Sequence, residues 1–162
     1  MTTECLEPQT RSKTLQGVAL CGFVILCFSA AALGALTPPG PWYQALAKPS
    51  WNPPAWVFGP VWTLLYLGMA VAAWRVWRKP QAQLALFAFG LQLLLNAAWS
   101  PIFFGAHALG WALVEILCLL LTIIWTMVLF FRRDCWAGML FVPYAMWVSF
   151  ASFLNATLWR LN

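Results

Sequence analysis

Charged residues are scarce in this chain. Asp, Glu, Lys and Arg make up 8% of its 162 residues, whereas hydrophobic residues make up 63%. Soluble globular domains carry about 25% charged residues, so this composition excludes an ordinary soluble domain. The mean hydropathy of +0.78 supports the same conclusion. Because the few charges also gather in short clusters, the sequence predicts an integral membrane protein.

The residue sets of common active sites and metal sites are also absent. The sequence contains one histidine, no Ser-His-Asp set, no paired carboxylates and no phosphate-binding loop. It has no CxxC spacing, which argues against a zinc site and a disulfide framework. No run of five basic residues occurs, so the net charge of +5 gives no reason to expect nucleic acid as a partner. We therefore expect no metal site, no obligatory cofactor and no separate catalytic constellation. The cysteines are Cys5, Cys21, Cys27, Cys118 and Cys135.

Long apolar spans fill most of the chain. A helix needs about 20 apolar residues to cross the hydrocarbon core of a bilayer, and each span has roughly this length. The spans are too long and too unalternating for the strands of a membrane barrel. The first is also longer than the apolar core of a signal peptide, so we expect it to be retained. The sequence predicts a polar tail at 1–14 and an all-α domain at 15–162, a bundle of five membrane-spanning helices at about 15–36, 55–74, 82–104, 108–131 and 136–159.

The cations divide unevenly between the two ends of this predicted bundle. One end carries seven cations and the other carries Lys48 and Arg160. The positive-inside rule then places the N-terminus in the cytoplasm if the host is a bacterial inner membrane, which we prefer; an outer membrane is the alternative. Arg160 is expected to anchor the chain at the interface. The seven are Arg11, Lys13, Arg75, Arg78, Lys79, Arg132 and Arg133.

A long loop rich in tryptophan and proline joins the first two predicted helices. Pro49, Pro53 and Pro54 exclude helix at the residues just before them. Beyond them, Phe58, Trp62 and Tyr66 recur every four residues, as on one helix face. The loop is interpreted either as a lid over one end of the bundle or as an interfacial tryptophan belt. The two roles are compatible. His107, in a later joint, is expected to be solvated, with haem ligation as the alternative.

The later helices carry stripes of aromatic and amide residues that we expect to face inward. Together with Trp62 and Tyr66, such stripes would form an aromatic box for a large planar apolar molecule. The amides also fit a second interpretation, as hydrogen bonds that join helices. Glu115 is expected to be an acid inside the bundle, with a transport role as the alternative. The stripes comprise Gln92, Asn96, Trp99 and Phe103, then Trp111 and Glu115, then Tyr144, Trp147, Ala151 and Asn155.

Three runs carry a resemblance to a known family: WYQALAKPSWNPPAWVFGPVWTLLY, LNAAWSPIFFGAHALGWALVE and FVPYAMWVSFASFLNATLWR. They resemble the translocator protein family, also called tryptophan-rich sensory proteins or, in animals, peripheral-type benzodiazepine receptors. The resemblance covers residues 15–162 and implies a five-helix bundle, often a homodimer, with a pocket beneath the first loop. It implies binding of porphyrins such as protoporphyrin IX, of haem, and of isoquinoline-carboxamide and benzodiazepine drugs.

The resemblance also assigns roles to residues. Trp62 and Trp147 match tryptophans implicated in porphyrin handling, Trp111 and Ala151 match positions lining the drug pocket, and Asn96 lies in the matching third-helix motif. Trp51, in the first run, completes the expected ligand-binding set. Animal members bind cholesterol through a motif with a tyrosine where this chain has Ala156, so cholesterol is a doubtful ligand here.

These features favour a membrane sensor or regulator that binds a tetrapyrrole. One alternative is breakdown of the porphyrin by chemistry that uses Trp62 and Trp147 as its catalytic residues. Another is transport of porphyrin or lipid, against which the lack of two inverted halves in the sequence argues. The sequence gives no further ground for an enzymatic activity, because no separate catalytic set is present.

Overall fold

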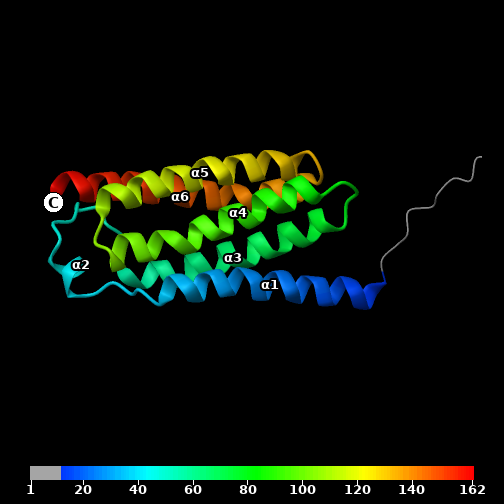
Figure 1. The fold of residues 1–162 in the computed structure, drawn as a ribbon, viewed down its shortest axis with the longest axis horizontal. Helices are drawn as coiled ribbons and strands as arrows, with labels where there is room; N and C mark the ends of the chain where they lie inside the picture. The colour runs from blue at the N-terminus through cyan, green and yellow to red at the C-terminus, as the bar shows by residue number, and fades with distance from the viewer. Residues whose placement is uncertain (1–11) are drawn as a thin grey trace, which may run out of the picture.

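The computed structural model describes residues 12–162 of the chain. Among these residues, five helices are long and apolar enough to cross a membrane, which confirms the predicted all-α membrane fold (Figure 1). A short helix, α2, lies in the loop that follows α1, and a π-helical turn, η1, follows α4. The elements are α1 (Lys13–Ala35), α2 (Pro41–Ala45), α3 (Ala55–Trp77), α4 (Gln83–Ser100), η1 (Pro101–Gly105), α5 (Leu109–Phe131) and α6 (Cys135–Leu161).

The helix ends differ slightly from those predicted. α1 begins at Lys13, so the last two residues of the predicted polar tail belong to the helix instead. Ser12 caps it, because its hydroxyl accepts a hydrogen bond from the Leu15 amide at 3.3 Å. Residues 1–11 of the predicted tail, with Cys5 and Arg11, lie outside the described residues. Pro101 ends α4 as expected, and the chain continues as the π-helical turn, in which the Ala106 amide donates to the Pro101 carbonyl at 2.8 Å.

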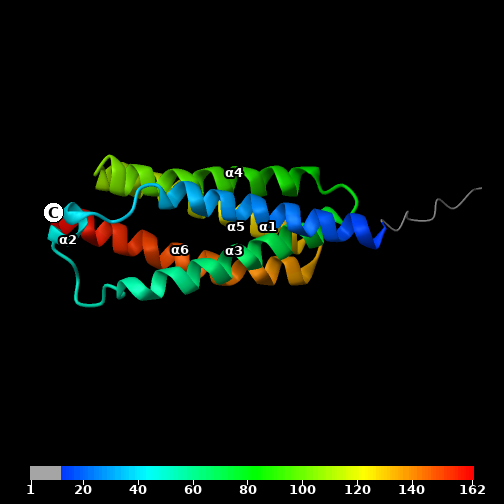
Figure 2. The ribbon, with the colours of Figure 1, turned by 90° about the horizontal axis from the view of Figure 1, so that it is seen from below.

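The long helices run up and down beside one another. α5 packs against α4 and α6, and α1 packs against α3 and α4. α2 and the C-terminus lie at one end of the bundle, which we call the loop end, while the start of α1 and the α5–α6 turn lie at the opposite end, the charged end (Figures 1 and 2). The buried seams contain many alanines, such as Ala70, Ala73 and Ala112. Small residues of this kind let helix backbones approach closely where no hydrophobic effect drives association in lipid.

Large apolar side chains cover much of the outer surface. Leu64, Leu94 and Leu121 are each more than two-thirds exposed, and α1 buries only Cys27 and Ala30. Helices that are apolar on both their inner and outer faces are typical of a bundle whose solvent is lipid. The exposed leucines therefore belong to a membrane-facing surface.

Asp134 connects two helices at the charged end. Its carboxylate caps α6 by accepting from the Ala137 amide at 3.0 Å, and it accepts from Arg75 Nε and Nη2 at 2.9 and 3.0 Å. Lys79 Nζ lies 3.5 Å away. Burial raises the pKa of Asp134, but the hydrogen bonds from Arg75 and Ala137 and the charges of Arg75 and Lys79 outweigh burial, so this pKa lies below its ordinary value. The carboxylate joins the end of α3 to the start of α6.

This lowered pKa predicts a loss of stability in acid. The contribution of Asp134 is fully present above its ordinary pKa of about 3.9 and is lost as pH falls through the still lower folded-state value. Thermal melting in lipid nanodiscs at pH 3 to 7 should show a drop below about pH 4 that is smaller in Asp134→Asn. At pH 7 that variant should be less stable by about 1–2 kcal/mol. An equal acid drop in both proteins would contradict the role of Asp134.

Gly138 permits the tight turn between α5 and α6. A Cβ built at this position would lie 2.3 Å from Cγ of Phe131. Because the base of the ring cannot move as freely as a chain end, we expect Gly138→Ala to destabilise the bundle by about 1–3 kcal/mol, measured as a lower melting temperature. Gly90→Ala is the matched control, since no atom beyond its chain neighbours and its own helix backbone lies within 4 Å of a Cβ built there. Alanine should be neutral or slightly stabilising there, because it favours helix. Equal effects of the two substitutions would contradict the packing at Gly138.

Candidate ligand-binding cavity

A cavity of about 1010 Å³ lies at the loop end of the bundle. Small-molecule sites measure about 300–1,000 Å³, so this cavity has room for a large ligand. All five long helices contribute to its wall. Residues of the loop 36–54 close one side, including Pro39, Tyr43 and Pro53.

Aromatic side chains form the deep walls. The ring of Phe58 packs edge-on against Trp147 with centroids 5.8 Å apart, and Trp62 lies 5.4 Å from Tyr66. Trp99, on α4, stacks on Phe103 at 4.7 Å. The expected aromatic wall is therefore present, and it brings together most of the predicted ligand-binding residues, namely Phe58, Trp62, Tyr66, Asn96, Trp99, Trp147, Ala151 and Asn155.

A buried hydrogen-bond network supports one wall. The Tyr66 hydroxyl donates to Asn96 Oδ1, Asn96 Nδ2 donates to the Tyr144 hydroxyl at 3.0 Å, and Tyr144 donates to Gln92 Oε1 at 3.0 Å. These bonds join α3, α4 and α6. Tyr144 is fully buried and does not line the cavity, so its predicted position in the wall is wrong. Instead, it holds the side chain of Asn96 by a hydrogen bond. Gln92 therefore joins helices through a hydrogen bond and does not line the cavity, whereas Asn96 belongs to the network and also lines the cavity.

A second polar contact fixes Trp99. The indole Nε1 of Trp99 donates to Asn155 Oδ1 at 3.2 Å, and Asn155 Nδ2 donates to the Leu109 carbonyl at 2.9 Å. This carbonyl belongs to the first turn of α5, whereas Asn155 comes from α6. The ring of Trp99 on α4 is therefore held by a residue of α6 that is itself bonded to α5.

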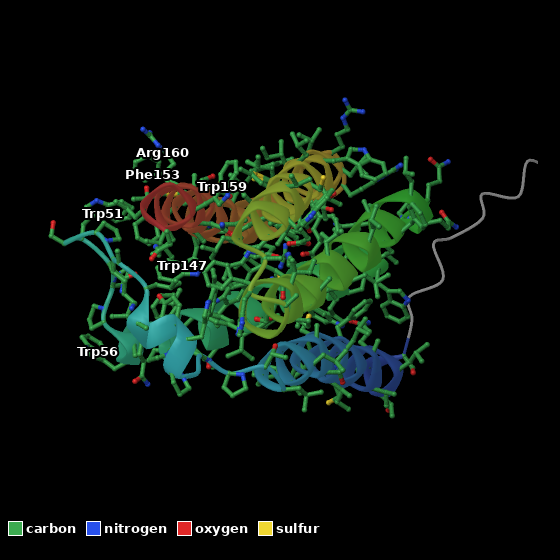
Figure 3. The ribbon with its side chains drawn as sticks, turned by 60° about the vertical axis from the view of Figure 1, so that its left-hand side comes forward. Trp51, Trp56, Trp147, Phe153, Trp159 and Arg160 are labelled. Carbon is green, nitrogen blue, oxygen red and sulfur yellow. The ribbon has the colours of Figure 1, made fainter. Side chains whose placement is uncertain are left out.

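The loop is tied down at several points. The Ala47 amide donates to Asn162 Oδ1 at 2.9 Å, and Tyr43 packs edge-on against Phe104 at 5.3 Å. Burial raises the pKa of the Tyr43 hydroxyl above its ordinary value. His107 is exposed, and its ring stacks on Trp42 at 4.1 Å. The loop lines the cavity, as a lid would, whereas Trp56 projects away from it (Figure 3) and is 75% exposed.

Trp111, Trp51 and Glu115 were also predicted to bind the ligand, but none of them lines the cavity. Trp111 is 73% exposed, because the buried face of α5 follows Ala112, Ile116 and Leu119 and the neighbouring position lies about 100° around the helix. Trp111 therefore points outward. Trp51 stacks on Phe153 at 5.3 Å and does not line the cavity (Figure 3).

Glu115, like Trp111, lies on α5 and was predicted to line the cavity, but its environment differs from that of Trp111. It also lies outside the cavity lining. Both of its carboxylate oxygens are buried, and neither has a hydrogen-bond partner in the described structure. The predicted acid within the bundle is present, while its place in the wall is taken by Ile116 and Leu119.

The sequence interpretation did not assign α1 or Lys48 to the cavity. Ala31, Gly34 and Ala35 of α1 line it, and a Cβ at Gly34 would lie 3.4 Å from Ser100 Oγ. Ala31 and Ala35 stand four residues apart in the sequence, a spacing typical of closely packed helices. Nothing in that spacing distinguishes a packing seam from a cavity wall.

Known proteins are similar to this chain in sequence. A profile of the TspO/MBR family matches residues 23–160. The chain is 44% identical over 140 residues to the tryptophan-rich sensory protein of Cereibacter sphaeroides, covering 86% of this chain and 89% of that protein. It is 41% identical over 144 residues to protein CrtK of Rhodobacter capsulatus, covering 86% and 90%. It is 42% identical over 126 residues to human translocator protein, covering 75% of each. This chain belongs to the TspO/MBR family.

Proposed function

We propose that the cavity binds a tetrapyrrole, a porphyrin or haem, and that the protein acts as a membrane sensor or regulator of that molecule. The observation that carries the proposal is the cavity itself, which offers about 1010 Å³ between the half-buried rings of Trp62, Trp99 and Trp147. Aromatic faces stack well on a large planar ring. The name of one relative, a tryptophan-rich sensory protein, supports the sensing role.

The cavity is also suited to other flat apolar molecules. Ala151 leaves space beside Trp147, and Asn96 and Asn155 supply amide groups at the wall. A few polar groups in an apolar cavity orient a ligand without requiring one chemical class. Isoquinoline-carboxamide and benzodiazepine compounds are therefore proposed as competing ligands of the same cavity.

A titration with protoporphyrin IX in lipid nanodiscs tests the proposal. Binding in the dark should quench tryptophan fluorescence saturably, because Trp62 and Trp147 line the cavity. Replacing either tryptophan by phenylalanine should weaken binding about three- to tenfold, since a smaller ring loses stacking area. Trp111→Phe, on the outer face of α5, is the matched control and should leave affinity unchanged. Quenching that never saturates, or that responds equally to all three variants, would overturn the proposal.

Breakdown of the bound porphyrin is a second candidate function. It is favoured by the position of Trp62 and Trp147, which both line the cavity and would lie against a bound macrocycle. Illumination of the complex should then remove porphyrin absorbance, and the loss should disappear in the two phenylalanine variants. A rate of loss equal to that of protoporphyrin IX in empty nanodiscs would exclude this activity.

We also propose an orientation in the membrane. Arg75, Lys79 and the start of α1 lie at the charged end, whereas Lys48 lies at the loop end. The positive-inside rule places the charged end in the cytoplasm of a bacterial inner membrane. The cavity would then lie toward the periplasmic side.

A further inference from the structure

One charged side chain lines the cavity within the described part of the chain, and it is Lys48. Lys48 follows α2 in the loop, and it is half-buried. A cation in an apolar cavity is costly unless its charge is compensated. The way in which Lys48 is held therefore bears on what the cavity accepts.

Neutral groups hold the ammonium in place. Lys48 Nζ donates to the carbonyl of Gln44 at 3.0 Å and to that of Leu46 at 3.1 Å. It also lies 4.7 Å from the centroid of the Tyr43 ring, within the range of a cation–π contact. These contacts position the cation at the loop without neutralising its charge.

The ammonium retains capacity for a ligand. A lysine has three N–H donors, and two are used by the carbonyls of Gln44 and Leu46. The ion pairs of residues 12–162 involve Arg75, Lys79 and Asp134 at the charged end, so no carboxylate of this part of the chain pairs with Lys48. One donor and one full positive charge are therefore open to an anion that enters the cavity.

A second polar atom lies at the same end of the cavity. Asn52, which also lines the cavity, has a buried Oδ1 without a hydrogen-bond partner in the described structure. Its Nδ2 donates to the Pro53 carbonyl at 3.1 Å. By contrast, the deeper wall contains Trp62, Ile116 and Leu119. The loop thus adds a cation and an unpaired acceptor to a cavity whose wall within the bundle is uncharged.

We infer that Lys48 binds a carboxylate of the ligand, so that the cavity binds a planar apolar molecule with an acidic group at one edge more tightly than the same molecule without its acidic group. The inference rests on the proposed function and specifies the class of ligand within it. The macrocycle would lie against Trp62 and Trp147, and the acidic edge would face the loop. An oriented site of this kind discriminates an acid from its neutral ester, because only the acid gains a charge-assisted hydrogen bond.

The experiment compares protoporphyrin IX, a dicarboxylic acid, with its dimethyl ester in neutral lipid nanodiscs at pH 7.5. Lys48→Gln should weaken binding of the acid about tenfold and change binding of the ester less than about twofold. Lys48→Arg should restore most of the affinity for the acid. Arg160→Gln is the matched control, because it removes one positive charge from the exposed C-terminal turn of α6, outside the cavity (Figure 3). It should change neither affinity.

Other outcomes overturn the inference in distinguishable ways. Unchanged binding of the acid to Lys48→Gln would remove the role of Lys48 and leave the proposed function intact. Equal weakening of acid and ester would show that Lys48 acts through the shape of the loop. If neither acid nor ester bound the unmodified protein saturably, the proposed function itself would fail.

Discussion

Ala151→Trp is expected to abolish binding of protoporphyrin IX within the measurable range, a loss of about a hundredfold or more, or ~2.7 kcal/mol. Ala151 lies on α6 and lines the cavity one turn from Trp147. An indole at this position would occupy the space between the rings that a planar ligand requires. The protein should remain folded, because the added side chain enters an existing cavity and does not overpack the closely fitted core.

The same titration measures this effect, with thermal melting of each variant as a check on folding. Ser149→Trp is the matched control, since Ser149 lies on the same helix and is exposed on the outer side of the bundle. It adds the same indole without entering the cavity and should leave affinity unchanged. Retained affinity in a folded Ala151→Trp protein would show that the ligand binds elsewhere.

Asn96→Ala is expected to lower the stability of the bundle by about 2–4 kcal/mol. Asn96 accepts from the Tyr66 hydroxyl and donates to Tyr144. Alanine would leave the Tyr66 hydroxyl, in a residue that is 6% exposed, without its acceptor. A buried donor with no partner costs more than the lost bond contributes, and lipid around the bundle offers no replacement.

Thermal melting of the purified variants in nanodiscs checks this expectation. Tyr66→Phe in the Asn96→Ala background should recover part of the loss, because it removes the unpaired hydroxyl. Thr63→Ala is a matched control on α3, since its exposed hydroxyl bonds only to the Gly59 carbonyl of its own helix. Equal melting temperatures for Asn96→Ala and Thr63→Ala would contradict the importance of the network.

Much of the fold could be predicted from the sequence, because helix length and apolar composition are dictated by the thickness of the bilayer. The inward face of α3 could also be predicted. Phe58, Trp62 and Tyr66 are the large aromatic residues at a helical spacing there, and all three line the cavity.

Helical spacing did not predict the inward face of α5, where Trp111 and Glu115 were wrongly expected to line the cavity. In a soluble helix, polarity distinguishes the outer face from the inner one, but lipid accepts Trp111 as readily as a protein core does. Both faces of α5 are apolar, so spacing alone did not fix its rotation. Ala112 and Ile116 mark the buried face, since a small residue permits the close approach to α4 and α6.

The role of Lys48 could not be derived from the sequence either. Its neighbours Pro49 and Trp51 predict a stiff loop, but the chain gives no sign of whether that loop folds over the cavity or away from it. In the structure the loop end is fixed by contacts between distant residues. Ala47 bonds to Asn162, 115 residues away in sequence, and Trp42 stacks on His107.

A structure of the protein determined with protoporphyrin IX in nanodiscs tests the central proposal most directly. We expect density for one macrocycle in the cavity, between Trp62 and Trp147, with a carboxylate within hydrogen-bond distance of Lys48 Nζ. Density for the macrocycle on the outer surface beside Trp111, with the cavity filled by lipid or side chains, would contradict it.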